Sequence, residues 1–256
     1  MKKHITLCCL MFLIALTAVS QEQYSDSQEL YREKYRPQYH YTPAHRWIGD
    51  PCGLIKFNGK YLAYCWGAAE STDLVHRKEL NNHAITQMPK GIAAFTGSVV
   101  IDRKNTAGYG ENTPIAAFTS FAEASKKQSQ SIAFSLDQGL TFKYYDLNPV
   151  LDIWSTEFRD PTVIRDEKND RWVMAVAKAL EKKVAFYHSA DLKHWTWMSD
   201  FGPMGGQERS WECPDLFQVC VDGNPEVKKW VLVVSVNWAR EQYFVGDFDG
   251  SRFVPD

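Results

Sequence analysis

Three acidic side chains stand at corresponding places along the chain, and each has a proline close behind it. Asp50 and Asp160 are followed directly by proline, and Glu212 is followed by a proline two residues on. If the three carboxylates converge, their like charges raise at least one pKa, which suits acid/base work. Two carboxyl groups about 5–5.5 Å apart suit cleavage of a glycosidic bond with retention of configuration. A single Asp-Pro pair commonly marks only a turn. Three acids at the same position of a repeated strand favour a shared chemical role.

The elements that position these acids are short strands in a repeat of about 55 residues. Asp160 follows Asp50 by 110 residues, and Trp230 follows Trp172 by 58 residues in matching second strands. Runs rich in Val, Ile, Tyr, Phe and Trp alternate with turn signals such as Asn-Gly and Asp-Gly. A period of this size, built from four short antiparallel strands, is typical of a β-propeller blade.

The predicted fold class is therefore all-β, and the strands fall into four groups. Because the innermost strand of each blade begins at the central axis, the three acids are expected to face one another across a funnel. Each acid is expected just before the strand that opens its group. The expected strands are Gly53–Phe57, Tyr61–Trp66 and Leu74–Leu80; Phe95–Ile101, Ile115–Phe121, Ser131–Ser135 and Thr141–Tyr145; Pro161–Arg165, Trp172–Ala177, Val184–Ser189 and His194–Met198; and Leu216–Val221, Trp230–Val236, Tyr243–Phe248 and a stub at Phe253.

The composition is ordinary for a soluble globular protein and excludes a disordered, collagen-like or multi-span membrane protein. The 256 residues are 45% hydrophobic and 23% charged, with a net charge of −2. Without a basic run, binding to nucleic acid is not expected. The aromatic share is 14%, and aromatic side chains favour strands and stack on flat apolar faces such as those of sugars.

The N-terminal sequence indicates an export signal. Lys2 and Lys3 precede an apolar stretch from Ile5 to Val19, which is too short for a comfortable membrane span of about 20 residues. Residues 1–20 are predicted to be a signal peptide cleaved near Ser20, followed by a lead segment over 21–36 and the propeller over 37–256. The mature chain is expected in the periplasm or outside the cell, without stable membrane insertion.

Four cysteines remain after this cleavage: Cys52, Cys65, Cys213 and Cys220. An even number in an exported chain permits disulfides. They are few for a chain of this size, so buried free thiols are the favoured interpretation. No Cys-x-x-Cys pair or histidine spacing indicates a metal site, and no cofactor is expected.

The motifs resemble those of glycoside hydrolase family 32, the β-fructofuranosidases that include invertases, levanases and inulinases. This family has a five-bladed propeller and usually a C-terminal β-sandwich. The segment Ser135–Phe142 separately resembles the Asp-box turn of propeller blades, where Asp137 would cap the turn. The family resemblance runs from Tyr35–His40 through Trp47–Pro51 and continues in Phe95–Ser98, Asn148–Leu151, Phe158–Pro161, Trp211–Asp215 and Tyr243–Gly250.

The family resemblance implies a role for each acid. Asp50 would be the nucleophile that attacks the anomeric carbon of a fructosyl unit, and Glu212 would be the acid/base. Asp160 would stabilise the transition state through fructose hydroxyls, and the neighbouring Arg159 would clamp the substrate. The implied partner is a carbohydrate, a β-fructofuranoside such as sucrose, a fructo-oligosaccharide, levan or inulin.

The substrate pocket departs from the family pattern in the first group of strands. Gly49 and Cys52 stand where the family usually has Asn, and a polar stretch after Tyr64 is missing, so the first blade is shortened. Trp47 and Trp66 flank the first acid and could stack on a sugar, and Phe95 and Ser98 fall in a family pocket motif. The predicted substrate-binding residues are Trp47, Gly49, Cys52, Trp66, Phe95, Ser98 and Arg159.

Several readings compete on the sequence. The leading one is an exported retaining fructosidase; a second is a fructan-binding propeller with weak or no activity; a third is another propeller glycosidase, of family 43 or sialidase type. Residues 50–256 hold nearly four repeats of about 55, so we expect only about four blades and no β-sandwich. Four blades set at the angles of a five-bladed ring would leave a gap, with apolar faces exposed and reduced activity.

Overall fold

The computed structural model describes residues 32, 34–37, 39–44 and 47–256. The chain divides into two units, Met1–Arg46 and Trp47–Asp256. The predicted signal peptide and all but a few residues of the predicted lead segment lie outside the described residues. In the described part of the first unit, the Arg36 guanidinium donates to the Thr42 hydroxyl and to the Pro43 carbonyl, both at 2.8 Å.

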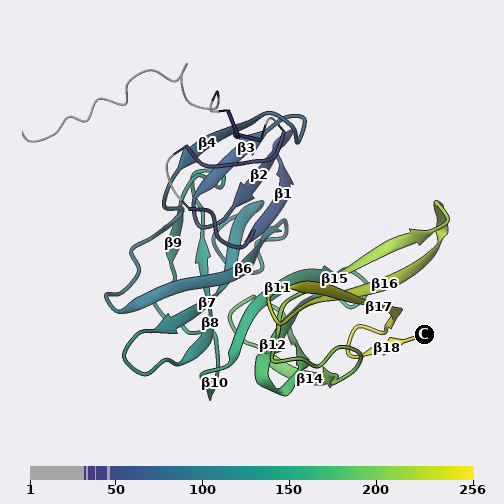
Figure 1. Ribbon diagram of the computed structural model, residues 1–256. Helices are drawn as coiled ribbons and strands as arrows, with labels where there is room; N and C mark the ends of the chain where they lie inside the picture. Colours follow the sequence, from purple (N-terminus) through teal and green to yellow (C-terminus); the bar gives the residue numbers. More distant parts are fainter. Residues whose placement is uncertain (1–31, 33, 38, 45–46) are drawn as a thin grey trace, which may run out of the picture. The chain divides into compact units, whose positions relative to one another are not determined.

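The second unit consists of four sheets that follow one another along the chain (Figure 1), and we call them blades 1 to 4. All strand pairs in them are antiparallel except β5 with β9. This is the predicted all-β propeller arrangement. Blade 1 contains β1 (Gly53–Phe57), β2 (Lys60–Tyr64), β3 (Ala68–Ser71) and β4 (Arg77–Asn81). Blade 2 contains β6 (Ile92–Asp102), β7 (Thr113–Ala122), β8 (Gln128–Phe134) and β9 (Phe142–Tyr144), with β5 (Ile85–Thr86) paired to β9 and β10 (Leu151–Ser155) paired to β8. Blade 3 contains β11 (Phe158–Asp166), β12 (Arg171–Lys178), β13 (Lys183–Ser189) and β14 (Thr196–Phe201), with a 3₁₀ turn at Ala179–Glu181. Blade 4 contains β15 (Trp211–Val221), β16 (Asn224–Val236), β17 (Arg240–Phe248) and β18 (Phe253–Pro255).

A hydrophobic core lies between each pair of successive blades, because alternate residues of a strand face opposite sides of its sheet. In β12, Trp172 and Met174 belong to the core shared with blade 2, whereas Val173 and Ala175 belong to the core shared with blade 4. A third core joins blades 1 and 2 and includes Leu62, Tyr64, Val99, Phe118 and Phe142. Period-two patterning thus fixes both the strands and the stacking of the blades.

Blade 4 has one face in a core and one face exposed. Figure 1 shows the β15–β16 hairpin projecting beyond β17 and β18, and both strands are longer than the sequence predicts. The exposed face of blade 4 is apolar in the described chain. Its exposed residues are Phe217, Val219, Val221, Tyr243, Val245 and Val254.

The sequence misplaces the outer half of blade 1. The third strand is β3, with the sequence Ala-Ala-Glu-Ser, and the fourth begins at Arg77, not Leu74. Small residues carry little strand propensity, so no run of large apolar residues marks β3. It is held instead by pairing with β2, where Ala63 lies opposite Ala69. The sequence also fails to predict β5, which pairs with the edge strand β9, and β10, which pairs with β8 beyond the short β9.

Asp137 caps the turn between β8 and β9, as the Asp-box resemblance implies. One of its carboxylate oxygens accepts the Thr141 backbone N–H at 2.8 Å and the Ser135 hydroxyl at 2.8 Å. The turn is tied to blade 1, because the Tyr64 hydroxyl donates to the Gly139 carbonyl at 2.8 Å. Asp137 therefore has a structural role.

The corresponding turns of blades 1 and 3 use a related device with the sequence Ser-x-Asp-x-x-His. Asp73 accepts the backbone N–H of His76 at 2.8 Å and contacts its ring nitrogen at 2.7 Å. Asp191 accepts the backbone N–H of His194 at 2.9 Å and contacts its ring at 2.7 Å. This repeat is visible in the sequence, since Asp191 follows Asp73 by 118 residues, close to two steps of the blade period.

Replacing Asp137 with Ala is expected to destabilise the protein by about 2 kcal/mol, because the Thr141 N–H and the Ser135 hydroxyl lose their acceptor. The change is measured as a lower urea midpoint. Glu111→Ala, an exposed position in another loop of blade 2, serves as the matched control with no expected shift. Equal midpoints for the two variants would contradict the structural role of Asp137.

Candidate active site

The inner strands of blades 1, 3 and 4 carry the three acids. Asp50 lies just before β1, as predicted, but Asp160 lies within β11 and Glu212 within β15. The prediction that every acid precedes its strand is wrong for these two. Pairing continues past both acids, because Phe158 pairs with Lys178 and Trp211 pairs with Val236.

A β-bulge sets the direction of each of these two side chains. The register shifts between Arg159 and Thr162 in β11 and between Glu212 and Asp215 in β15. Asp160 has a φ of 63° and Cys213 a φ of 47°, so both stand in the left-handed region. The following prolines have no N–H to give to a ladder, and they are tolerated at bulges. Bulges re-aim side chains, and here they turn the acidic motifs toward the axis.

A third bulge positions Thr96 in β6 of blade 2, where the register shifts between Ala94 and Gly97. The Thr96 hydroxyl donates to a carboxylate oxygen of Asp50 at 2.8 Å. A Cβ atom at Gly97 would stand 2.0 Å from the Ala117 carbonyl oxygen. Only glycine therefore lets β6 approach β7 closely enough to present Thr96.

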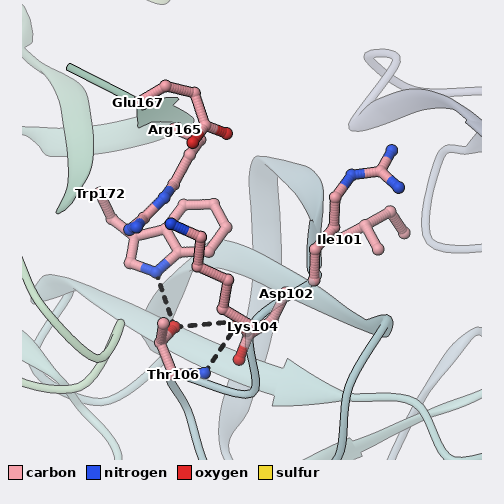
Figure 2. A pocket seen from close by; sticks show the side chains of 8 residues that line it. Ile101, Asp102, Lys104, Thr106, Arg165, Glu167 and Trp172 are labelled. Carbon is pink, nitrogen blue, oxygen red and sulfur yellow. Dashed lines mark hydrogen bonds between the residues drawn. The ribbon is translucent and has the colours of Figure 1, made fainter. Parts of the chain in front are cut away.

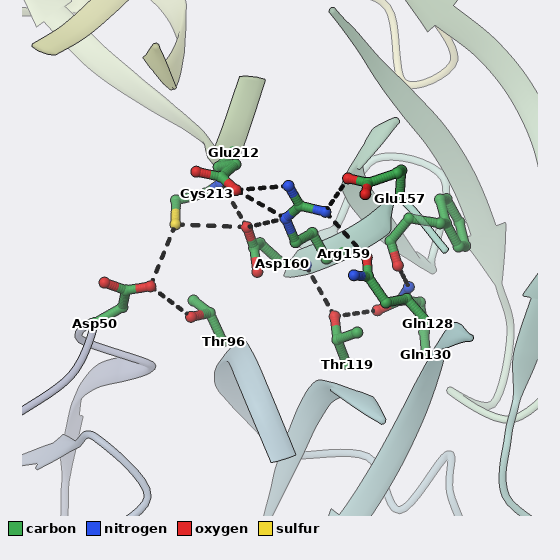
Figure 3. Close-up of polar contacts among 11 residues, drawn as sticks. Asp50, Thr96, Thr119, Gln128, Gln130, Glu157, Arg159, Asp160, Glu212 and Cys213 are labelled. Carbon is green, nitrogen blue, oxygen red and sulfur yellow. Dashed lines mark hydrogen bonds and ion pairs between the residues drawn. The ribbon is translucent and has the colours of Figure 1, made fainter. Parts of the chain in front are cut away.

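The three acids meet around Cys213 (Figure 3). The Cys213 sulfur lies 3.9 Å from a carboxylate oxygen of Asp50 and 3.6 Å from one of Asp160. The Cys213 backbone N–H donates to the same oxygen of Asp160 at 3.1 Å. Burial and the surrounding carboxylates raise the pKa of the Cys213 thiol, so it stays protonated and can lie between two acids.

Within the described part of the chain, the four cysteines that remain after the predicted cleavage form no disulfide. The expectation of burial holds for Cys52, whereas Cys65 and Cys213 are half-buried and Cys220 is exposed on the β15–β16 hairpin. The hairpin is longer than predicted, and Cys220 therefore lies outside the blade cores.

Arg159 connects the acids to blade 2. Its Nε and Nη2 donate to the Oε1 atom of Glu212 at 2.9 and 2.6 Å. Its Nη1 donates to Glu157 at 2.7 Å and to the Gln128 side chain at 3.2 Å. The guanidinium is thus held between two carboxylates, and its side chain is only 12% exposed.

Asp160 is the most buried of the three acids. The residue is 5% exposed, and burial raises the pKa of its carboxyl to about 6, with the charges of Glu212 and Asp50 acting in the same direction. The Cys213 N–H and the Arg159 charge oppose this rise. The site thus holds this buried carboxylate ionised at neutral pH at a cost to stability.

Replacing Asp160 with Asn is expected to raise stability at pH 7 by up to about 3 kcal/mol. The folded-state pKa lies above the ordinary value, so the favourable contribution of this group is complete below about pH 4 and is lost as the pH rises to about 6. Asn is neutral at every pH and can still accept the Cys213 N–H. Urea unfolding at pH 4, 5, 6 and 7 measures the effect. A variant that keeps the parent's pH dependence would contradict it.

Several residues that support the site are not identified by the sequence motifs. The Thr119 hydroxyl accepts the Asp160 backbone N–H and donates to Gln130, both at 2.9 Å. Gln130 in turn donates to the Phe158 carbonyl at 2.9 Å. Residues 128–131 are four consecutive polar residues that are buried within β8. A polar run inside a predicted strand is the sequence signal that could have identified these supporting residues. Thr96, Glu157 and Cys213 also support the site, through hydrogen bonds to Asp50, Arg159 and Asp160 respectively.

The comparisons with known proteins assign this constellation to a family. Residues 40–256 match the sequence model described as "Glycosyl hydrolases family 32 N-terminal domain". The chain belongs to this family. It is 40% identical to the levanase of Bacillus subtilis over 99% of this chain and 40% of the relative. It is 36% identical to the extracellular exo-inulinase inuE of Aspergillus niger over 88% of this chain and 50% of the relative.

A solved relative shares the fold. The fructofuranosidase from Schwanniomyces occidentalis, solved in complex with fructose, is 36% identical and superimposes with a TM-score of 0.78 over 86% of this chain and 48% of that chain. The present chain therefore spans about half or less of the length of these relatives. Membership of family 32 decides against the family 43 and sialidase interpretations.

A cavity of about 650 Å³ lies along the inner strands of this family 32 propeller. Cys52 lies on its wall, but the residue is 4% exposed and its thiol donates to the Asp50 carbonyl at 3.2 Å. The Ser98 hydroxyl accepts the Val163 N–H at 3.0 Å. Both residues are thus engaged in holding the inner strands. The polar residues along the cavity include Asp50, Thr96, Ser98, Asp160, Cys213 and Asp215.

The aromatic residues predicted to bind substrate differ in their surroundings. Trp47 is 85% exposed, and its ring lies 3.3 Å from where a Cβ atom would stand at Gly49. Trp66 donates its indole N–H to the Phe95 carbonyl at 2.7 Å, which joins blade 1 to blade 2. The Phe95 ring stacks on Phe121 at 4.6 Å. Trp47 is therefore the one of these three with an open ring.

A second pocket lies between blades 2 and 3, and none of the three acids lines it (Figure 2). The Trp172 indole N–H donates to the Thr106 hydroxyl at 2.8 Å, and the Arg165 guanidinium lies 5.1 Å from the Trp172 ring. Lys104 and Arg165 both bind Asp170. These contacts use the charged groups of the pocket to join the two blades.

Proposed function

We propose that this chain carries the active site of a retaining β-fructosidase that acts on sucrose, fructo-oligosaccharides, levan or inulin. The observation that carries the proposal is the convergence of Asp50, Asp160 and Glu212 from three blades around Cys213. Family membership supports it, as do the levanase and exo-inulinase names of two relatives. The fructose complex of a solved relative supports a fructosyl pocket.

In the proposed reaction, the Asp50 carboxylate attacks the anomeric carbon and forms an ester while the bond to the leaving oxygen breaks. Glu212 gives its proton to that oxygen. Water then attacks the anomeric carbon, Glu212 takes the water proton, and the Asp50 carboxylate leaves. This requires the Asp50 and Glu212 carboxyl groups to lie about 5–5.5 Å apart in the substrate complex. Asp160 would accept hydrogen bonds from fructose hydroxyls that strengthen in the transition state.

Arg159 would link substrate binding to the position of the acid/base Glu212. In the structure its guanidinium donates twice to the Oε1 atom of Glu212, so Oε2 is the oxygen that would carry the proton, and breaking the pair would let the carboxyl group turn toward the leaving oxygen. Fructose hydroxyls that accept from Arg159 would compete with Glu212, while Glu157 keeps the guanidinium in place from the other side. Substrate binding would thereby free the acid/base.

A fructan-binding propeller with weak or no turnover is the second candidate, because Asp50 is exposed and Glu212 is held by Arg159. One assay separates the two. Fructose release from sucrose, levan, inulin and short fructo-oligosaccharides is expected from the wild-type chain and not from Asp50→Asn. Binding of a fructan without any release of fructose would support the second candidate and contradict the first.

We also propose that the protein is exported. The signal in residues 1–20 and the extracellular exo-inulinase relative support this. Over the residues that the structure describes, no helix has the length and apolar character needed to cross a membrane. Mass spectrometry of the N-terminus of the exported protein would show whether cleavage falls near Ser20.

A further inference from the structure

The turn between β16 and β17 lies beside the strand segment that carries Glu212. Glu212 pairs with Ser235 in the β15–β16 ladder, and the turn begins two residues after Ser235. The Asn237 N–H donates to the Ser210 carbonyl at 3.1 Å. The turn holds only residues 237–239, since Val236 pairs with Arg240, so Trp238 lies at the same end of blade 4 as Glu212.

Trp238 is an exposed aromatic ring with one face already covered. The residue is 63% exposed, and the Arg209 guanidinium lies 3.8 Å from its ring centroid. A cation at this distance is attracted to the face of an indole ring. With Arg209 on one face, the exposed area of the ring is available to a ligand.

The segment before Glu212 holds the turn that carries Trp238 at several points. Besides the Asn237–Ser210 hydrogen bond, Arg240 lies 3.7 Å from Glu208, and the Gly206 N–H donates to the Gln242 side chain at 2.8 Å. These links hold the turn against residues 206–210, which lead directly into Glu212. Because the turn is held and Arg209 covers one face of the ring, Trp238 loses less conformational freedom when a ligand binds than a ring on a loose loop would.

We propose that Trp238, backed by Arg209, is a platform for the leaving-group saccharide of a β-fructofuranoside. The inference rests on the proposed function, in which Glu212 protonates the leaving oxygen. The saccharide on that oxygen must then lie on the Glu212 side of the site, where Trp238 stands. An indole face stacks on the apolar face of a pyranose or furanose ring, so Trp238 determines specificity through the leaving group.

The test compares two substrates that differ only in the leaving group, sucrose and methyl β-D-fructofuranoside. In Trp238→Ala, the ratio of kcat/KM for sucrose to kcat/KM for the methyl fructoside is expected to fall about tenfold, equivalent to 1.4 kcal/mol, mainly through KM for sucrose. Trp238→Phe keeps an aromatic face and should recover most of the ratio. Trp197→Ala is the matched control, since Trp197 is 57% exposed on β14 of blade 3 and its indole N–H binds Asp200.

The outcomes separate this inference from the function on which it rests. If the wild-type chain cleaves both substrates and Trp238→Ala keeps the parent ratio, the platform is wrong and the fructosidase proposal stands. A Trp238→Ala variant that loses activity equally on both substrates also overturns the platform, because such a loss is not tied to the leaving group. If the wild-type chain cleaves neither substrate, both proposals fail. Unfolding midpoints of the variants show whether they are folded.

Discussion

Asp50→Asn should leave a folded protein whose kcat for fructose release is at least about 10⁴-fold lower than that of the parent. An amide cannot form the ester with the anomeric carbon, and no other carboxylate shares this position before β1. The Asn oxygen can still accept the Thr96 hydroxyl, which donates to Asp50 at 2.8 Å. The substitution therefore removes the nucleophile and keeps the local contact. Initial rates on sucrose and on the preferred fructan measure the loss.

The matched control for this experiment is Asp247→Asn. Asp247 is exposed on β17, and its partner is Lys229 at 3.2 Å. Lys229 pairs with Val219, seven residues along β15 from Glu212, so this ion pair lies at the other end of blade 4. The activity of Asp247→Asn should equal that of the parent. An Asp50→Asn variant that retains more than a tenth of the parent activity would show that Asp50 is not the nucleophile.

The repeat is the part of the fold that the sequence predicts well. Strand propensity and turn residues mark blades 2 to 4, and the acids lie at matching steps of one period, so their convergence follows from the geometry of a propeller. The core residues follow from alternation, as in β12, where Trp172 and Val173 face different blades. Blade 1 is predicted less well, because β3 is made of small residues whose strand conformation depends on pairing with β2.

The polar structure of the site could not be predicted from the motifs. The bulges at Asp160 and Cys213 depend on the register between neighbouring strands, which no local pattern encodes. The ion pair between Arg159 and Glu212 joins residues 53 positions apart. Each of the two residues stands at the start of a bulge, one in β11 and one in β15, and only the packing of these two strands brings them together. Family resemblance names Arg159 as a substrate clamp, but it does not show that the guanidinium rests on Glu212 when substrate is absent.

Glu212→Ala should lower kcat on sucrose by about 10³-fold, because no group then protonates the leaving oxygen or activates water. The loss should be much smaller in the first step on a substrate with a good leaving group, such as an aryl β-fructofuranoside, which needs little protonation. Arg159 loses one carboxylate partner but keeps Glu157 and Gln128, so we expect the fold to persist. Added azide should then accelerate turnover of the aryl fructoside, because azide attacks the fructosyl-enzyme without a general base.

The product of this rescue reports directly on the mechanism. Azide that replaces water in the second step gives a β-fructosyl azide, since two displacements at the anomeric carbon restore the original configuration. Asp50→Asn is the matched control: it forms no fructosyl-enzyme, so azide has no intermediate to intercept and should not accelerate it. An α-configured azide from Glu212→Ala would mean a single displacement and would contradict Asp50 as nucleophile. Parent-like rates on sucrose without azide would instead remove Glu212 from the acid/base role and leave its pairing with Arg159 as a structural contact.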